Sequence, residues 1–201
     1  MNDAYLVRVM SLLGDVRNSH SGPEAWRQIE GELGFGLPGD FKALVDAYSP
    51  IKLNQHIYLQ HPGATPRWNL GEYIRDTCQA WSAVSWDGDI DGDPRTVLEL
   101  SEMEFGTARG LTPVASADSG QVVFLARHPR DLSPLVVVDD GDGEFFTYAM
   151  SFSEWLYRYL IGEDMSGPNS SYFHPGPVQL ESLPMSPDDA VVQWRGPARG
   201  M

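Results

Sequence analysis

The side chains whose types and spacing could do chemistry are mainly carboxylates. Asp87, Asp89 and Asp91 alternate with other residues in the run D-G-D-I-D-G. Calcium-binding EF-hand loops begin in this way, with oxygen ligands at positions 1, 3 and 5 and a glycine at position 6. The twelfth position should be glutamate but is Leu98, and Pro94 stands where the loop needs a backbone amide. The pattern therefore favours a solvated acidic loop, or an acidic prong for a basic partner, over a cation site.

The other reactive side chains form no recognisable catalytic or metal-binding pattern. The five histidines and the single cysteine lack the spacing of a zinc site. Cys78 falls on the apolar side of a predicted helix, which is typical of a small core residue; as a nucleophile it would need a histidine partner. Ser119 lacks the G-x-S-x-G elbow of hydrolases, and no glycine-rich phosphate loop occurs. We therefore expect no catalytic residue, no metal, no cofactor and no enzymatic activity.

The formal net charge of −14 restricts the class of partner. A strongly acidic chain is repelled by nucleic-acid phosphates and by anionic membrane surfaces, and it attracts basic proteins. The charge is concentrated, because the segment 87–144 holds 13 acidic residues against four basic ones. The sequence therefore predicts a protein partner, with no nucleic acid and no membrane.

Candidate partner-binding residues lie in and around the acidic segment. Trp86 precedes the acidic loop, and tryptophan is enriched at the packed centres of interfaces; the alternative is that its ring folds down onto the domain. Three of the aspartates fall in a predicted hairpin turn, where they would first serve the turn itself. The complete predicted set is Trp86, Asp87, Asp89, Asp91, Asp93, Asp118, Asp139, Asp140 and Asp142.

The elements that must position these residues begin with two short helices between 23 and 48. Pro23 and Glu24 suit a first helical turn, and Gly34 suits the residue just after a helix. Pro38 and Asp40 then open a second helix in the same manner. Two short amphipathic helices cannot bury their apolar faces on each other alone, so they need a sheet to pack against.

The rest of the chain supplies that sheet. Further helices are predicted over 3–17, 69–84 and from the capping box at 151–154 to about 161. Strands are predicted within 51–60 and at 111–117, 121–127, 135–140 and 144–150, the last two joined by a Gly-Asp-Gly turn. We expect an α+β fold, with a mainly antiparallel sheet of four to six strands and helices on one face and at its ends.

The helix pair also resembles a known family. The pattern W-x-x-I-E-x-x-L-G-x-x-L-P-x-D-F-K-x-L is similar to the opening of the SUKH superfamily, and it is formed here by Trp26, Ile29, Glu30, Leu33, Gly34, Leu37, Pro38, Asp40, Phe41, Lys42 and Leu44. The later order of strands, D-S-G turn, D-G turn and S-F-x-E-W-L helix resembles the second half of the same domain. The resemblance covers about 26–161, and we expect a domain of this family at 23–161. Apolar spacing predicts an N-terminal helical extension at 1–22, and the proline and glycine content of 162–201 predicts an irregular tail.

The family includes yeast-type cell-wall-assembly regulators and bacterial immunity proteins of polymorphic toxin systems. The resemblance therefore implies a non-enzymatic protein that binds and neutralises a basic toxin domain, often a nuclease or a deaminase. A regulatory scaffold or ligand-binding module is the alternative. One cysteine allows no internal disulfide, and the N-terminus lacks the pattern of a signal peptide, so we expect a cytoplasmic protein.

Overall fold

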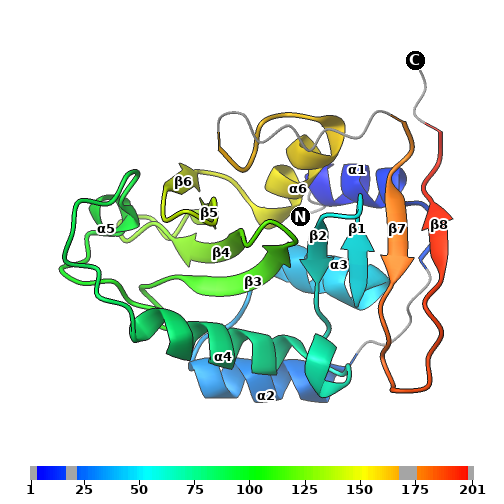
Figure 1. Ribbon diagram of the computed structural model, residues 1–201, viewed down its shortest axis with the longest axis horizontal. Coiled ribbons are helices and arrows are strands. Elements are labelled where there is room, and N and C mark those ends of the chain that lie inside the picture. Colours follow the sequence, from blue (N-terminus) through cyan, green and yellow to red (C-terminus); the bar gives the residue numbers. More distant parts are fainter. Residues whose placement is uncertain (1–3, 17–21, 168–175, 199–201) are drawn as a thin grey trace.

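The computed structural model describes residues 4–16, 22–167 and 176–198, which form one antiparallel sheet with helices around it (Figure 1). The helices of the described residues are α1 (Ala4–Leu13), α2 (Pro23–Leu33), α3 (Gly39–Tyr48), α4 (Leu70–Ser82), α5 (Pro94–Leu98) and α6 (Phe152–Ile161), with a 3-10 turn η1 (Pro66–Trp68). The strands are β1 (Ile51–Leu53), β2 (Ile57–Leu59), β3 (Thr112–Ala117), β4 (Val122–Arg127), β5 (Pro134–Asp139), β6 (Phe145–Tyr148), β7 (Gln179–Ser182) and β8 (Gln193–Arg195).

The sheet has eight strands in the order β6-β5-β4-β3-β2-β1-β7-β8, so the prediction of four to six strands was wrong. The α+β class and the antiparallel pairing were predicted correctly. The additional strands β7 and β8 come from the tail at 162–201, whose proline and glycine content led us to expect irregular structure. They form because Leu53 and Leu180 face each other across β1 and β7 and are both buried in the core.

The two halves of the sheet are covered differently. Along β4, Val123 packs into one hydrophobic cluster with α1, α3 and α6, whereas Phe124 packs into a second cluster with α5 and the end of α4. Alternate residues of a strand point to opposite faces, so β4 and β5 are buried on both sides. The half formed by β2, β1, β7 and β8 is covered on one face only, by the helices behind it in Figure 1.

Polar residues of the opening motif fix the elbow between α2 and α3. The Glu30 carboxylate accepts hydrogen bonds from the Leu37 amide at 2.9 Å and from Lys42 Nζ at 2.7 Å. Burial raises the pKa of Glu30, but these two partners outweigh it and hold the pKa below its ordinary value. Gly34 ends α2 with a φ of 78°, a conformation that glycine adopts without steric cost. The motif therefore encodes the bend itself as well as two apolar faces.

Two further side chains of this helix pair connect it to distant segments. The indole nitrogen of Trp26 donates to Asp46 Oδ1 at 2.8 Å, which joins α2 to α3. The Asp40 carboxylate accepts from the Ser153 amide at 2.8 Å, at the first turn of α6. A carboxylate is stabilised at a helix N-terminus because the free amides there carry partial positive charge. The elbow thus fixes the position of α6 on the same face of the sheet.

No helix in the described ranges has both the length and the apolar character needed to cross a membrane. The three-part division of the chain stays a prediction. However, Val9 of α1 and Leu180 of β7 belong to the same buried cluster as the central helices.

If the C-terminal segment is an integral part of the core, truncating a buried side chain within it should destabilise the whole protein. Leu180 is 2% exposed, and Leu180→Ala should lower the free energy of unfolding by about 2–5 kcal/mol through lost burial and the remaining cavity. Urea denaturation followed by circular dichroism measures this change. Val191→Ala is the matched control, because Val191 is 53% exposed in the same segment and should change stability by less than about 0.5 kcal/mol. Equal, small effects of both substitutions would contradict the packed tail.

Candidate functional site

The predicted acidic loop lies against the second hydrophobic cluster through its tryptophan. Trp86 is half-buried, stacks on Trp81 with ring centroids 5.5 Å apart, and donates from its indole nitrogen to the Trp81 carbonyl at 2.9 Å. Its ring therefore folds down onto the domain and supports the loop from beneath. The aspartates at 87, 89 and 91 that follow it are exposed.

Asp93 differs from the exposed aspartates of this loop because it forms an ion pair within the domain. Its carboxylate caps α5 by accepting from the Arg95 amide at 2.9 Å, and it forms an ion pair with Arg95 Nη2 at 2.7 Å. The hydrogen bond from the Arg95 side chain, followed by the backbone hydrogen bond, lowers the pKa of Asp93 in spite of its partial burial. Arg95 also donates to the Trp86 carbonyl at 3.0 Å, so this pair organises the loop.

The three aspartates of the β5–β6 turn have separate structural roles. Asp139 is 4% exposed and accepts from the Gly141 amide at 3.0 Å. Its burial raises the pKa to about 6, an effect that the Gly141 amide opposes and the neighbouring Asp140 reinforces. Asp140 accepts from the amides of Asp142 and Glu144 at 2.8 and 3.2 Å, which closes the turn. Asp142 is exposed.

The structure brings the three acidic segments together at one end of the β3–β6 strands. The Phe145 amide at the start of β6 donates to the Asp91 carbonyl at 2.9 Å, which joins the loop to the β5–β6 turn. That turn in turn meets the β3–β4 turn, because a Cβ placed on Gly141 would lie 3.0 Å from the Ser119 carbonyl oxygen. We call this continuous surface the acidic ridge, and its exposed or half-exposed carboxylates are Asp87, Asp89, Asp91, Asp118, Asp140 and Asp142.

Asp118 connects the acidic ridge to the uncovered half of the sheet. It forms an ion pair with Lys52 Nζ at 2.6 Å and accepts from the Tyr58 hydroxyl at 2.5 Å. These two hydrogen bonds, Lys52 first, lower the pKa of Asp118. Lys52 also lies 4.8 Å from the centre of the Tyr58 ring, so lysine, tyrosine and aspartate form one polar cluster across β1, β2 and the β3–β4 turn.

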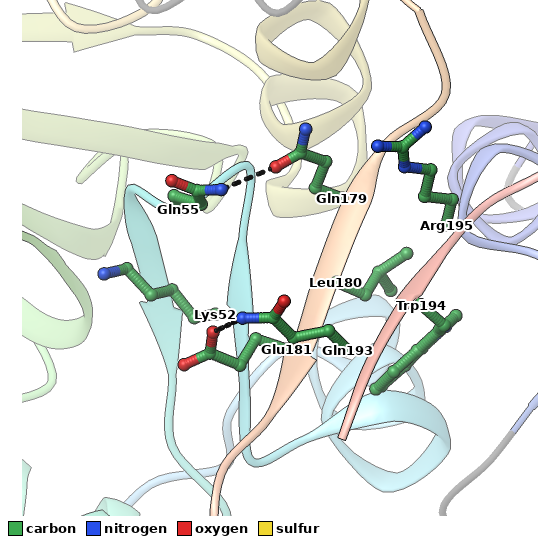
Figure 2. Close-up of a pocket in the computed structure, with 8 residues that line it drawn as sticks. All are labelled: Lys52, Gln55, Gln179, Leu180, Glu181, Gln193, Trp194 and Arg195. Atoms are coloured by element: carbon green, nitrogen blue, oxygen red, sulfur yellow. Dashed lines mark hydrogen bonds between the residues drawn. The ribbon is translucent and has the colours of Figure 1, made fainter. Parts of the chain in front are cut away.

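The uncovered face of β2, β1, β7 and β8, which we call the open face, is lined by polar and aromatic side chains. A groove of about 220 Å³ crosses β1, β7 and β8, with the hydrogen bonds Gln55–Gln179 and Gln193–Glu181 along it (Figure 2). A second, wider cavity of about 560 Å³ lies beside Tyr58 and Trp68, whose rings stack with centroids 5.6 Å apart. The guanidinium of Arg67 lies 5.0 Å from the centre of the Trp68 ring.

Sequence reasoning did not identify the open face as a possible interface. The sequence does carry a sign of this face, namely the alternation of polar and apolar residues: Lys52 and Tyr58 are each flanked by buried apolar residues in β1 and β2. The same alternation occurs in Q-L-E-S of the tail, where Leu180 is buried and Glu181 is not, and in Q-W-R, where Trp194 is half-buried between two exposed residues. Four short strands with polar residues on one face indicate a sheet with one uncovered side.

The structure also places Ser119 beside a histidine of the β1–β2 turn. His56 is 4% exposed; its Nε2 lies 3.2 Å from Ser119 Oγ and its Nδ1 lies 2.8 Å from the Tyr159 hydroxyl. Burial is the main cause that lowers the pKa of His56 to about 4, so the imidazole is neutral at pH 7. A serine protease triad has a carboxylate where Tyr159 stands, and it holds the histidine ready to become positively charged. This arrangement therefore suits a structural chain of hydrogen bonds that joins α6 to the β1–β2 turn and the β3–β4 turn.

Within the ranges that the structure describes, no group of three or more histidine, cysteine or acidic side chains is placed to hold a metal ion. Cys78 is half-buried, and its burial raises the pKa of the thiol to about 11. His20 and His174 lie outside the described residues.

Comparison with known proteins identifies a protein-family model that matches most of this chain. The family model SUKH_6, described as SMI1-KNR4 cell-wall, matches residues 23–156, which is about two thirds of the chain. The matched region runs from α2 to the first turn of α6, and it excludes α1, β7 and β8. Neither the curated proteins nor the solved structures contain a match to this chain.

The buried carboxyl of Asp139 should make stability depend on pH. Its pKa in the folded protein is about 6, well above the value of about 3.9 expected for an unfolded chain. The folded state therefore holds this proton more tightly, and stability should fall as the pH rises from about 4 through 6. Asp139→Asn removes the charge but keeps an oxygen for the Gly141 amide. It should raise the free energy of unfolding by roughly 1–3 kcal/mol at pH 8 and have little effect at pH 4.

Chemical denaturation at the two pH values provides this measurement, and Asp142→Asn is the control in the same turn. Because Asp142 is exposed, its substitution should leave stability nearly unchanged at both pH values. A loss of stability in Asp139→Asn at pH 8 would show that the carboxylate is stabilising and would overturn this account.

Proposed function

Because the chain belongs to the SMI1-KNR4 cell-wall (SUKH) family, we propose that it is a non-enzymatic binding protein that recognises and neutralises a basic toxin domain. In this proposal it acts as a cytoplasmic immunity protein, and its partner is a nuclease or a deaminase. The acidic ridge is the observation that carries the proposal, because it gathers into one surface carboxylates that are scattered through the segment 87–142.

The electrostatics of the acidic ridge suit a partner that handles nucleic acid. Enzymes that hold phosphate groups carry basic surfaces, and a carboxylate-rich inhibitor would cover those surfaces in place of the nucleic acid. The exposed Asp87, Asp89 and Asp142 have no ion-pair partner among the described residues, so their charges are available to a partner's lysines and arginines. The net charge of −14 would also raise the association rate by roughly 10- to 1,000-fold at low ionic strength.

The second candidate function is a regulatory scaffold, and the open face favours it. Tyr58, Trp68 and Arg67 belong to the residue types that dominate the energetics of protein interfaces, and all three line one cavity. A partner bound there would be held largely by apolar and stacking contacts. Binding of that kind is less sensitive to salt than binding through exposed charges.

The two candidates make different predictions for charge neutralisation. The triple substitution Asp87→Asn, Asp89→Asn and Asp142→Asn should weaken binding of a basic partner by roughly tenfold or more at low salt, because exposed interfacial charges mainly set the association rate. The measurement is capture of proteins from the native cell lysate on the immobilised full chain. Bound proteins are then identified and titrated at low and high ionic strength.

The matched control is Asp15→Asn, Asp76→Asn and Asp188→Asn, which makes the same change in net charge at three exposed sites outside the acidic ridge. A basic, toxin-like partner that is lost with the first triple and kept with the second supports the immunity function. A partner that is indifferent to both triples and to salt would instead favour the scaffold function.

A further inference from the structure

The two edges of the sheet are finished in different ways. At the β6 edge, the Phe145 amide donates to the Asp91 carbonyl at 2.9 Å, and Gly92 lies so close that a Cβ there would be 1.8 Å from the Phe145 carbonyl oxygen. The acidic loop therefore covers the beginning of that edge, at Phe145. At the opposite edge lies β8, and Figure 1 shows it as the outermost strand beside β7.

The hydrogen bonds of β8 show which of its backbone groups face outward. The Ser182 amide donates to the Val192 carbonyl at 2.8 Å, and the Gly196 amide donates to the Val178 carbonyl at 2.9 Å. In an antiparallel pair the bonded residues alternate, so Gln193 and Arg195 direct their amide and carbonyl groups away from β7. None of the backbone hydrogen bonds between segments in the described residues reaches these outward groups.

The side chains along this edge are also available for contact. Val191 and Val192 are 53% and 50% exposed, and Gln193 and Arg195 are exposed as well. Arg195 and Gln193 line the groove on the open face, whereas Trp194 packs partly into the core on the other face. Arg195 forms no ion pair with any described residue, so its charge is available to an acidic side chain of a partner.

We propose that the free edge of β8 binds an extended segment of the partner protein, which adds to the sheet as a further strand and places an acidic side chain beside Arg195. The outward amide and carbonyl groups of Gln193 and Arg195 would form the main-chain hydrogen bonds of this pairing. On the other face, an apolar side chain of the added strand would cover Val192 and the exposed part of Trp194. This inference rests on the proposed function, because it assumes that the ligand is a protein.

Charge argues for a different protein over a second copy of this chain. Two chains with a net charge of −14 each repel one another, and a symmetric pairing of β8 with itself would bring no acidic side chain of β8 to Arg195. A partner that is basic overall would be attracted by the acidic ridge and would still supply one acidic residue at the strand. The acidic ridge would attract the partner, and the edge of β8 would fix the position of its strand.

The test uses the full chain and a phage-displayed library of random linear peptides as the probe. Selection on the immobilised protein should enrich peptides with alternating apolar side chains and one acidic residue, and a synthesised peptide should bind in titration calorimetry. Gln193→Pro removes the outward N–H together with the side chain that donates to Glu181, and it leaves the backbone hydrogen bonds between β8 and β7 in place. It should weaken peptide binding by roughly tenfold or more. Gln193→Ala keeps that N–H and should bind as the wild type does.

A second pair of variants tests the same site without a proline substitution, so the result does not depend on whether Gln193→Pro folds. Arg195→Glu should weaken the same peptide by a similar factor, whereas Arg67→Glu, an equal charge change at the neighbouring cavity, should not. Circular dichroism confirms that each variant is folded. Protection of the Gln193 and Arg195 amides from hydrogen exchange on peptide binding would place the peptide at the edge.

Selection that enriches no peptide, or peptides that bind Gln193→Pro and Arg195→Glu as tightly as the wild type, would overturn the inference. Dimerisation of the free chain that Gln193→Pro abolishes would also overturn it, because the edge would then serve a second copy. If lysate capture depends on the acidic ridge but not on Gln193→Pro, the proposed function stands and strand addition is wrong. If peptides bind at β8 but no cellular protein is captured, strand addition stands and the proposed function is wrong.

Discussion

The carboxylate of Glu30 is the contact on which the arrangement of helices depends. It lies at the elbow of α2 and α3, where it accepts from the Leu37 amide and from Lys42. Removing this carboxylate would leave the Leu37 amide and the Lys42 ammonium without their hydrogen-bond acceptor, and the folded state would lose stability. The fixed elbow lets α3 pack on the sheet and lets Asp40 hold the first turn of α6.

The helices α1, α3 and α6 cover one face of the sheet, and the region 86–105 covers part of the other face. The region 86–105 covers only β4, β5 and their neighbours. The strands β2, β1, β7 and β8 therefore keep one open face, and β8 keeps a free edge. The charged residues divide in the same way. The acidic ridge lies at the covered half, and the open face carries Lys52, Arg195, Glu181 and the stacked rings of Tyr58 and Trp68. Asp118 joins the two surfaces through Lys52.

Local patterns were sufficient to predict the helix pair, the strands β3 to β6 and the capped helix α6, because caps, turns and apolar spacing act over a few residues. They did not predict β7 and β8, since three- and four-residue strands in a proline-rich tail gain their stability from pairing with a distant strand, as Leu180 does with Leu53. The carboxylates of the predicted site were visible in the sequence, but their partners were not: Asp93 is paired to Arg95 and Asp139 is buried. Pairings such as Ser119 with His56 depend on the tertiary fold and have no local signal.

Hydrogen–deuterium exchange of the full chain, alone and with its captured basic partner, tests the central claim most directly. In the proposed complex the partner lies on the acidic ridge and along the open face, and the helices on the other face stay free. We therefore predict added protection in the segments 87–92 and 191–195, with α1 and α2 unchanged. Protection confined to α1, α2 or α6, with both predicted segments exchanging as in the free chain, would contradict the account.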